Sequence, residues 1–146
     1  MASAATAKVF VPSEIRFVDL AHAAAEKAAE VAGCDEDTAL NFGIAVREAV
    51  INAMTHGNRL DPKRKAELVF SIGPRGVRAT VRDHGLGFDP TATPDPTSRE
   101  NLLLTSGRGL LMMRAYCDNV GFRYREGRGM EVTLVKKVHS SGRVAP

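Results

Sequence analysis

The stretch "REAVINAMTHGN" (residues 47–58) carries a carboxylate, an amide and an imidazole within a helix that is otherwise largely apolar. Glu48, Asn52 and His56 are spaced four residues apart, so they share one face of that helix. Buried polar side chains are unfavourable unless they are hydrogen-bonded or bind a ligand. The spacing therefore indicates either a solvated polar stripe or a binding site, and the rest of the chain has to discriminate between the two.

The helix that contains this stretch has a polar stripe and an apolar side. The stripe starts further back, with Asn41 and Ala45 at the same spacing. The apolar side is expected to pack on a sheet and consists of Phe42, Val46, Val50 and Ala53. The acidic run "DED" (35–37) suits the positive end of a helix dipole, so we expect the helix to begin at Asp35 and to end near Gly57.

The remaining sequence alternates between helical and strand-like periodicity. The expected elements are, in order, a strand at 8–12, a helix from Ser13 to Gly33, a strand pair around the turn "GPRG" (73–76), a helix at 109–117 and a strand pair around the turn "EGRG" (126–129). Ser13 is the expected N-cap of the first helix, and Leu20 and Val31 fall at its apolar spacing. This order predicts an α+β fold, a two-layer sandwich of helices on a mixed, mostly antiparallel sheet. We expect one domain at 8–138 and a flexible tail at 139–146.

The composition is that of an ordinary globular domain and argues against several classes of function. Of the 146 residues, 44% are hydrophobic and 25% are charged, and the net charge is only +3. The arginines are scattered, which argues against direct nucleic-acid binding, and no apolar run approaches the roughly 18 residues of a membrane span. Cys34 and Cys117 show no CxxC or metal-binding spacing, so we expect two buried thiols in a reducing, cytoplasmic compartment.

A second motif is "VRDHGLGFDP" (81–90), in which Asp83, Gly85 and Gly87 directly follow a strand. The glycines allow a flat ligand to approach the backbone closely, and the aspartate can accept a hydrogen bond from an exocyclic amine. A glycine-rich strand exit with a turn-forming aspartate is the alternative interpretation. The motif alone does not discriminate between them.

A third motif is "TSGRGLLMM" (105–113), in which Gly107, Arg108 and Gly109 open a helix. Free backbone N–H groups at a helix start bind phosphate, and the arginine adds positive charge, although an ordinary Ser/Gly helix start would look similar. The preceding residues 84–106 contain prolines and no sustained periodicity, which is typical of a functional lid or a disordered segment. The chain has no GxxxxGK[ST] motif, so this is not a P-loop.

The three motifs become specific through their order. A helix with Glu48 and Asn52, a strand ending in DxGxG, a lid and a GxGL helix start together resemble the nucleotide site of the GHKL ATPase superfamily, which includes gyrase, the heat-shock chaperone and histidine kinases. The resemblance spans residues 8–138. The small size and the form "EAVINAMTHGN" (48–58) resemble the bacterial anti-sigma-factor serine/threonine kinases. This implies a histidine-kinase-like ATPase fold and an ATP-dependent protein kinase.

The resemblance also implies roles for the motif residues. Asn52 would ligate the Mg²⁺ at the ATP phosphates, and Glu48 would be the general base toward a serine hydroxyl or a water. Asp83 would bond the adenine amino group, while His56 is left with a structural role or a part in orienting the following loop. The remaining cofactor-binding positions, which make room for the nucleotide or hold its phosphates, would be Gly85, Gly87, Gly107, Arg108 and Gly109. The implied partners are an antagonist protein that carries the serine, a sigma factor that is sequestered, and a second copy of the chain in a homodimer.

One position departs from the family pattern. Met130 in "GRGMEV" (127–132) stands where the family usually has a threonine whose hydroxyl lies beside the adenine. The lost hydroxyl is worth about 1 kcal/mol, which implies weaker ATP binding. A regulator that holds ATP and clasps a partner without phosphotransfer is therefore kept as the alternative, although Glu48 favours the kinase.

Overall fold

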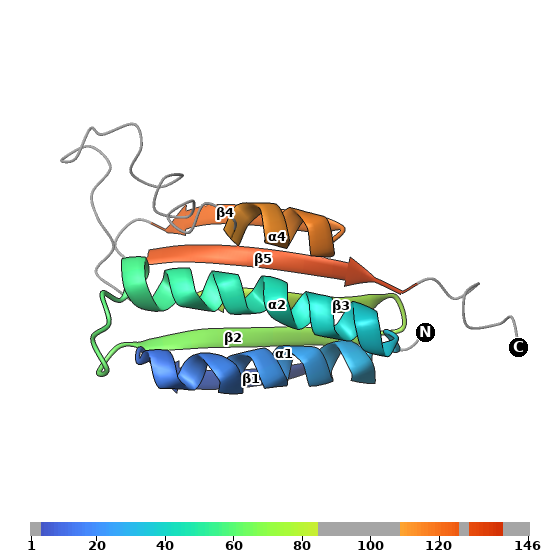
Figure 1. Cartoon of the computed structure of the whole chain (residues 1–146), viewed down its shortest axis with the longest axis horizontal. Coiled ribbons are helices and arrows are strands. Elements are labelled where there is room, and N and C mark those ends of the chain that lie inside the picture. Colours follow the sequence, from blue (N-terminus) through green and yellow to red (C-terminus); the bar gives the residue numbers. More distant parts are fainter. Residues whose placement is uncertain (1–3, 85–108, 126–128, 139–146) are drawn as a thin grey trace, which may run out of the picture.

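The computed structural model of the chain describes residues 4–84, 109–125 and 129–138. Within these residues, helices cover one face of a five-stranded sheet with the strand order β1-β2-β3-β5-β4 (Figure 1). The strands are β1 (Ala5–Pro12), β2 (Lys65–Gly73), β3 (Gly76–Arg82), β4 (Asn119–Arg125) and β5 (Gly129–Lys137). The α-helices are α1 (Val18–Val31), α2 (Glu36–Asn52) and α4 (Gly109–Tyr116). The predicted α+β two-layer sandwich is confirmed.

The sheet follows from the alternation of apolar residues in two hairpins. Ala66, Leu68 and Phe70 of β2 are buried against the helices, while the intervening side chains point to the uncovered face. The two predicted strand pairs are present, β2 with β3 and β4 with β5, and β3 pairs with β5 between them. Every pairing in the described residues is antiparallel, so the sheet there is antiparallel rather than mixed.

The core lies between the sheet and the helices, and α2 contributes many of its residues. Asp35 caps this helix as expected, because its carboxylate accepts the backbone N–H of Thr38 at 2.7 Å. The residues predicted for its apolar side, Phe42, Val46, Val50 and Ala53, are all buried. Both Cys34 and Cys117 are free thiols, and burial raises the pKa of Cys117 to about 12 and also raises that of Cys34, so neither forms a reactive thiolate readily at neutral pH.

The start of the first helix differs from the prediction. A short 3₁₀ turn (Ile15–Phe17) precedes α1, and the residue at the N-cap position, Phe17, provides no side-chain cap. Ser13 is not a cap: its hydroxyl is buried and donates to the carbonyl oxygen of Arg64, in the loop before β2. Helical spacing also overstated the apolar side of α1, since its small alanines fill the interface and Leu20 and Val31 remain exposed.

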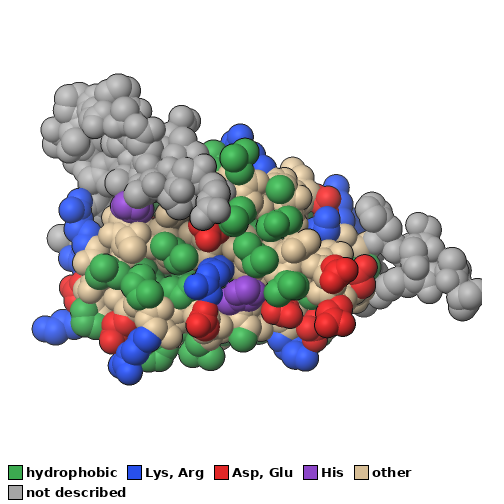
Figure 2. Space-filling view, in the orientation of Figure 1, with side chains coloured by type: hydrophobic (Ala, Val, Ile, Leu, Met, Phe, Trp, Pro, Cys, Tyr) green, Lys and Arg blue, Asp and Glu red, His purple; other side chains and the backbone are tan. Residues whose placement is uncertain are grey.

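The helix-covered face shows no broad region of a single charge. Figure 2 shows cationic, acidic and hydrophobic side chains interleaved over the helices, with acidic groups gathered at the end where α2 begins. None of the helices in the described part of the chain is long and apolar enough to cross a membrane.

Candidate nucleotide site

The polar stripe of α2 runs into one end of the sheet. Asn52, the last residue of the helix, is 8% exposed, and Glu48 lies half-buried one turn earlier. Glu48 forms no hydrogen bond or ion pair with any residue of the described ranges, although a half-buried carboxylate gains from a partner. Of the two interpretations of the stripe, a ligand-binding face fits this pair better than a solvated surface.

The helix does not stop at Asn52 but widens into a π-helical turn (Ala53–Gly57), in which the backbone N–H of Asn58 donates to the carbonyl oxygen of Ala53, five residues earlier. Such turns occur frequently at functional sites. His56 is half-buried on this turn, and burial, followed by the positive charge of Arg59, lowers its pKa. His56 therefore stays neutral to lower pH than an exposed histidine. The chain then leaves the helix through Arg59 and Leu60, which both adopt left-handed backbone angles (φ 54° and 55°).

Asp83 is buried at the end of β3, where backbone atoms of neighbouring segments surround its carboxylate. Its side chain is 3% exposed, and one carboxylate oxygen accepts the backbone N–H of Met130 at 2.9 Å. A Cβ atom added to Gly57 would lie 2.2 Å from the Asp83 carboxyl carbon, and one added to Gly129 would lie 1.9 Å from a carboxylate oxygen. Only glycine fits at either position. The π turn after Asn52 and the aspartate of the second motif are thus in direct contact.

Met130 approaches Asp83 through its main chain. Its backbone N–H and carbonyl both bond Asp83, the carbonyl accepting the Asp83 N–H at 3.2 Å, while its side chain packs partly buried against the core. Any non-proline residue at this position could make these two bonds. The way in which the aspartate is held therefore does not depend on the methionine side chain.

A buried asparagine that the motif analysis overlooked fixes the exit of β3. Asn58 is fully buried; its amide donates to the Ser13 hydroxyl at 2.9 Å, and its carbonyl oxygen accepts the backbone N–H of His84 at 2.8 Å. The Ser13 hydroxyl in turn donates to the Arg64 carbonyl at 2.6 Å. The network anchors the residue that follows Asp83. The only sign of this network in the sequence is a polar residue, Asn58, directly after the glycine that ends the helix. Such a pair is common in ordinary loops.

Asn58→Ala is expected to lower the free energy of unfolding by about 1–3 kcal/mol, because a buried hydrogen-bonding network loses its central member. The measurement is urea denaturation at constant temperature. Asn119→Ala provides a matched control, since Asn119 is exposed on β4 and should change stability by less than about 0.5 kcal/mol. Equal stability of Asn58→Ala and the parent would show that the network contributes nothing to the fold.

Four of the residues predicted to bind the nucleotide, Gly85, Gly87, Gly107 and Arg108, lie outside the described residues, as do nearly all of the expected lid at 84–106 and the tail at 139–146. Gly109 is described: it is buried and begins α4, which packs against α2. Since α4 ends beside the last residues of β5, its first residue lies toward the opposite end of the sheet, where Asp83 is found (Figure 1).

The described residues at this end of α2 include oxygen donors of the kind that a small divalent cation takes. Asn52 offers an amide oxygen and Glu48 a carboxylate, the oxygen ligands that Mg²⁺ prefers. Among the described residues no three His, Cys, Asp or Glu side chains converge as a metal site, so a cation here would take most of its ligands from phosphate and water. That is the usual coordination of Mg²⁺ at nucleotides. The residues present therefore fit the expected group.

Comparisons with known proteins agree with the resemblance drawn from the motifs. A family model described as a histidine kinase-like ATPase domain matches residues 11–136. The anti-sigma F factor of Anoxybacillus flavithermus is 32% identical over 103 residues, which cover 66% of this chain and 67% of the relative. The anti-sigma F factor of Clostridium perfringens is 29% identical over 99 residues (66% and 70% of the two chains). That of Geobacillus thermodenitrificans is 33% identical over 99 residues (66% and 67%).

Proposed function

Because this chain belongs to the histidine kinase-like ATPase family, whose domains bind ATP, usually with Mg²⁺, we propose that it is an anti-sigma factor with serine/threonine kinase activity. The observation that carries the kinase assignment is Glu48. It is a half-buried carboxylate without a partner among the described residues, one helical turn from Asn52 on the helix whose end contacts Asp83. A protein that only binds nucleotide has no need of a carboxylate at that position.

Each motif residue has a proposed part in holding ATP. Asp83, already fixed by a backbone N–H and two glycines, would accept the adenine amino group, with Gly85 and Gly87 leaving space for the base. Asn52 would provide the protein ligand of Mg²⁺, which when bound supplies charge neutralisation at the phosphates. The phosphates themselves would be held at the start of α4 by Gly107, Arg108 and Gly109.

The chemistry that Glu48 would perform is general base catalysis. Its carboxylate would accept the proton of a serine hydroxyl as the serine oxygen bonds the γ-phosphorus and the bond from that phosphorus to the ADP oxygen breaks. Phosphoryl transfer depends mainly on positioning and charge stabilisation, so one carboxylate, one amide and helix-end N–H groups are sufficient. Half-burial favours this role because it limits competing water around the base.

The proposed partners follow from the relatives, whose names describe them as anti-sigma F factors. We propose that the chain sequesters a sigma factor, that the phosphorylated serine lies on an antagonist protein, and that the kinase acts as a homodimer. ATP supply and two free thiols fit a cytoplasmic setting.

The test is incubation of the protein with γ-labelled ATP, Mg²⁺ and the antagonist protein encoded nearby. Label on an antagonist serine supports the kinase, and replacement of that serine by alanine should abolish it. A protein that binds ATP and its partner while transferring no label would instead be a nucleotide-gated clasp.

A further inference from the structure

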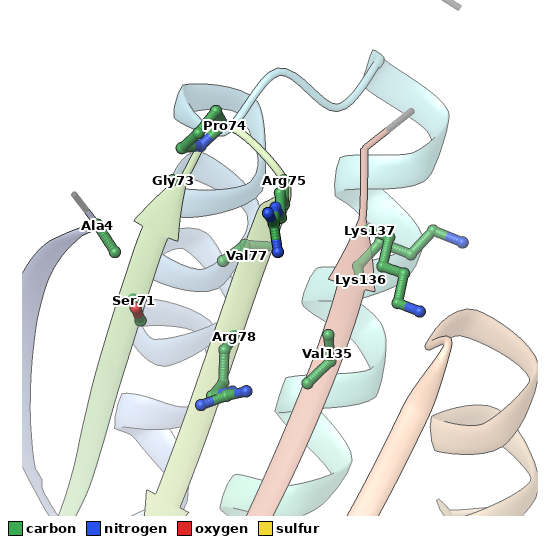
Figure 3. A pocket seen from close by; sticks show the side chains of 11 residues that line it. Ala4, Ser71, Gly73, Pro74, Arg75, Val77, Arg78, Val135, Lys136 and Lys137 are labelled. Carbon is green, nitrogen blue, oxygen red and sulfur yellow. The ribbon is translucent and has the colours of Figure 1, made fainter. Parts of the chain in front are cut away.

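The uncovered face of the sheet is hollowed at the end opposite Asp83. The hollow lies between the turn that joins β2 to β3 and the last residues of β5, and it has a volume of about 680 Å³ (Figure 3). Its described lining includes the cationic residues Arg75, Arg78 and Lys137, beside apolar surface such as Pro74 and Val135. Lys136 also borders it, but its side chain lies on the same side of the sheet as its buried neighbour Val77. We refer to it as the basic groove.

Two glycines border the groove. Gly73 and Gly76 pair with each other across the hairpin, so no side chain covers the sheet at that point. A Cβ atom on Gly76 would lie 2.1 Å from the Lys136 carbonyl oxygen, and its φ of +137° disfavours any other residue. The turn therefore packs closely against the backbone of β5 and forms one wall of the groove.

The positive charges in the basic groove are largely uncompensated. Lys136 lies 3.7 Å from a carboxylate oxygen of Asp118, whereas Arg75, Arg78 and Lys137 form no ion pair with any of the described residues. At the other end of the same face the arrangement is different. There Arg82 pairs with both Glu67 and Glu131, so its charge is neutralised within the protein.

We propose that the basic groove binds an acidic segment of a partner protein. The guanidinium group of an arginine can bind a carboxylate through two parallel hydrogen bonds. The apolar lining can accommodate aliphatic side chains that lie between the acidic side chains of the partner segment. Nucleic acid fits less well, because a strand that continues along this face from the groove would reach Arg82, whose charge is already paired with Glu67 and Glu131. The described lining also contains no aromatic side chain on which a base could stack.

This docking surface is independent of the proposed nucleotide site. The groove reaches into β3 as far as Arg78, and Asp83 follows five residues later, which in an extended strand is roughly 17 Å. Variants in the groove should therefore leave the thermal stabilisation by Mg-ATP unchanged. Absence of that stabilisation in the parent would count against the proposed kinase, whereas the groove is tested by a separate binding assay.

The test uses fluorescence anisotropy with a short labelled peptide of alternating Glu and Val residues. Arg75→Glu combined with Arg78→Glu should weaken binding by about tenfold or more, and binding to the parent should weaken as salt is added. The matched control is Lys63→Glu combined with Lys65→Glu, two exposed residues near the start of β2 that change the net charge equally. The control should change binding by less than about twofold.

Further arms exclude other occupants and a folding artefact. The double variant Arg75→Gln with Arg78→Gln removes the positive charges without adding negative ones. It replaces the charge-reversed variant in the binding assay if that variant has a lowered melting temperature. A labelled single-stranded DNA oligonucleotide should bind more weakly than the peptide. Equal loss of peptide binding in the lysine control, absence of peptide binding by the parent, or tighter DNA binding that the groove variants remove would each overturn the proposal.

Discussion

Asp83→Ala is expected to remove most of the thermal stabilisation that Mg-ATP gives to this protein. A ligand present at about 100 times its dissociation constant adds roughly 2.7 kcal/mol, which corresponds to a rise in melting temperature on the order of 8 °C for a chain of this size. The carboxylate accepts the Met130 N–H and lies against Gly57 and Gly129, neither of which has a side chain that could take its place. The shift should fall to about a tenth of the parent value or less once adenine recognition is lost.

The Asp83 variants need a comparison that separates stability from binding. Asp83→Ala also deprives the Met130 N–H of its acceptor, so each variant is compared with its own melting temperature without nucleotide. Asp83→Asn keeps an oxygen for that N–H and should give an intermediate shift. Asp118→Ala is the matched control, because Asp118 likewise accepts a backbone N–H of β5, from Lys137 at 2.6 Å, at the far end of the strand. A full shift in Asp83→Ala would remove Asp83 from the adenine site.

The elements that were predictable from the sequence depend on local patterns. Apolar alternation at Leu68 and Phe70 and the intervening "GPRG" turn define the β2–β3 hairpin without reference to the rest of the chain. The cap at Asp35 is equally local, since its hydrogen bond to Thr38 closes within one helical turn. Patterns of this kind fix which face of each element is apolar, and therefore the two-layer fold.

The features that were missed depend on contacts between distant residues. Ser13 looked like a helix cap, but its hydroxyl bonds Arg64, 51 residues further along the chain. Asn58 and its bond to His84 have no periodic signature, and the need for glycine at 57 and 129 appears only when both backbones approach Asp83. That the motif residues share one site remains a prediction from their order, and the contacts around Asp83 could be seen only once the sheet was assembled.

Glu48→Gln is expected to lower phosphotransfer to the antagonist by roughly 10²–10⁴-fold while leaving the nucleotide-dependent thermal shift close to that of the parent. Glutamine keeps the size and most of the hydrogen-bonding capacity of the side chain, but it cannot accept a proton, and a general base contributes on this scale. Half-burial and the absence of a partner among the described residues mean that no structural contact is lost with the charge. Glu36→Gln, an exposed change in the first turn of the same helix, should transfer at the parent rate.

Asn52→Ala should behave differently from Glu48→Gln, because Asn52 is proposed to ligate the metal and not to move a proton. Losing a ligand oxygen weakens both Mg-ATP binding and transfer, so the thermal shift and the rate should fall together, and Asn52→Asp should recover part of both. Transfer by Glu48→Gln at the parent rate would show that Glu48 is not the base. If the parent binds ATP and its partner but transfers no phosphate, the kinase assignment fails. The polar face of α2 would then belong to a nucleotide-gated clasp, and Glu48→Gln could not be tested through a transfer rate.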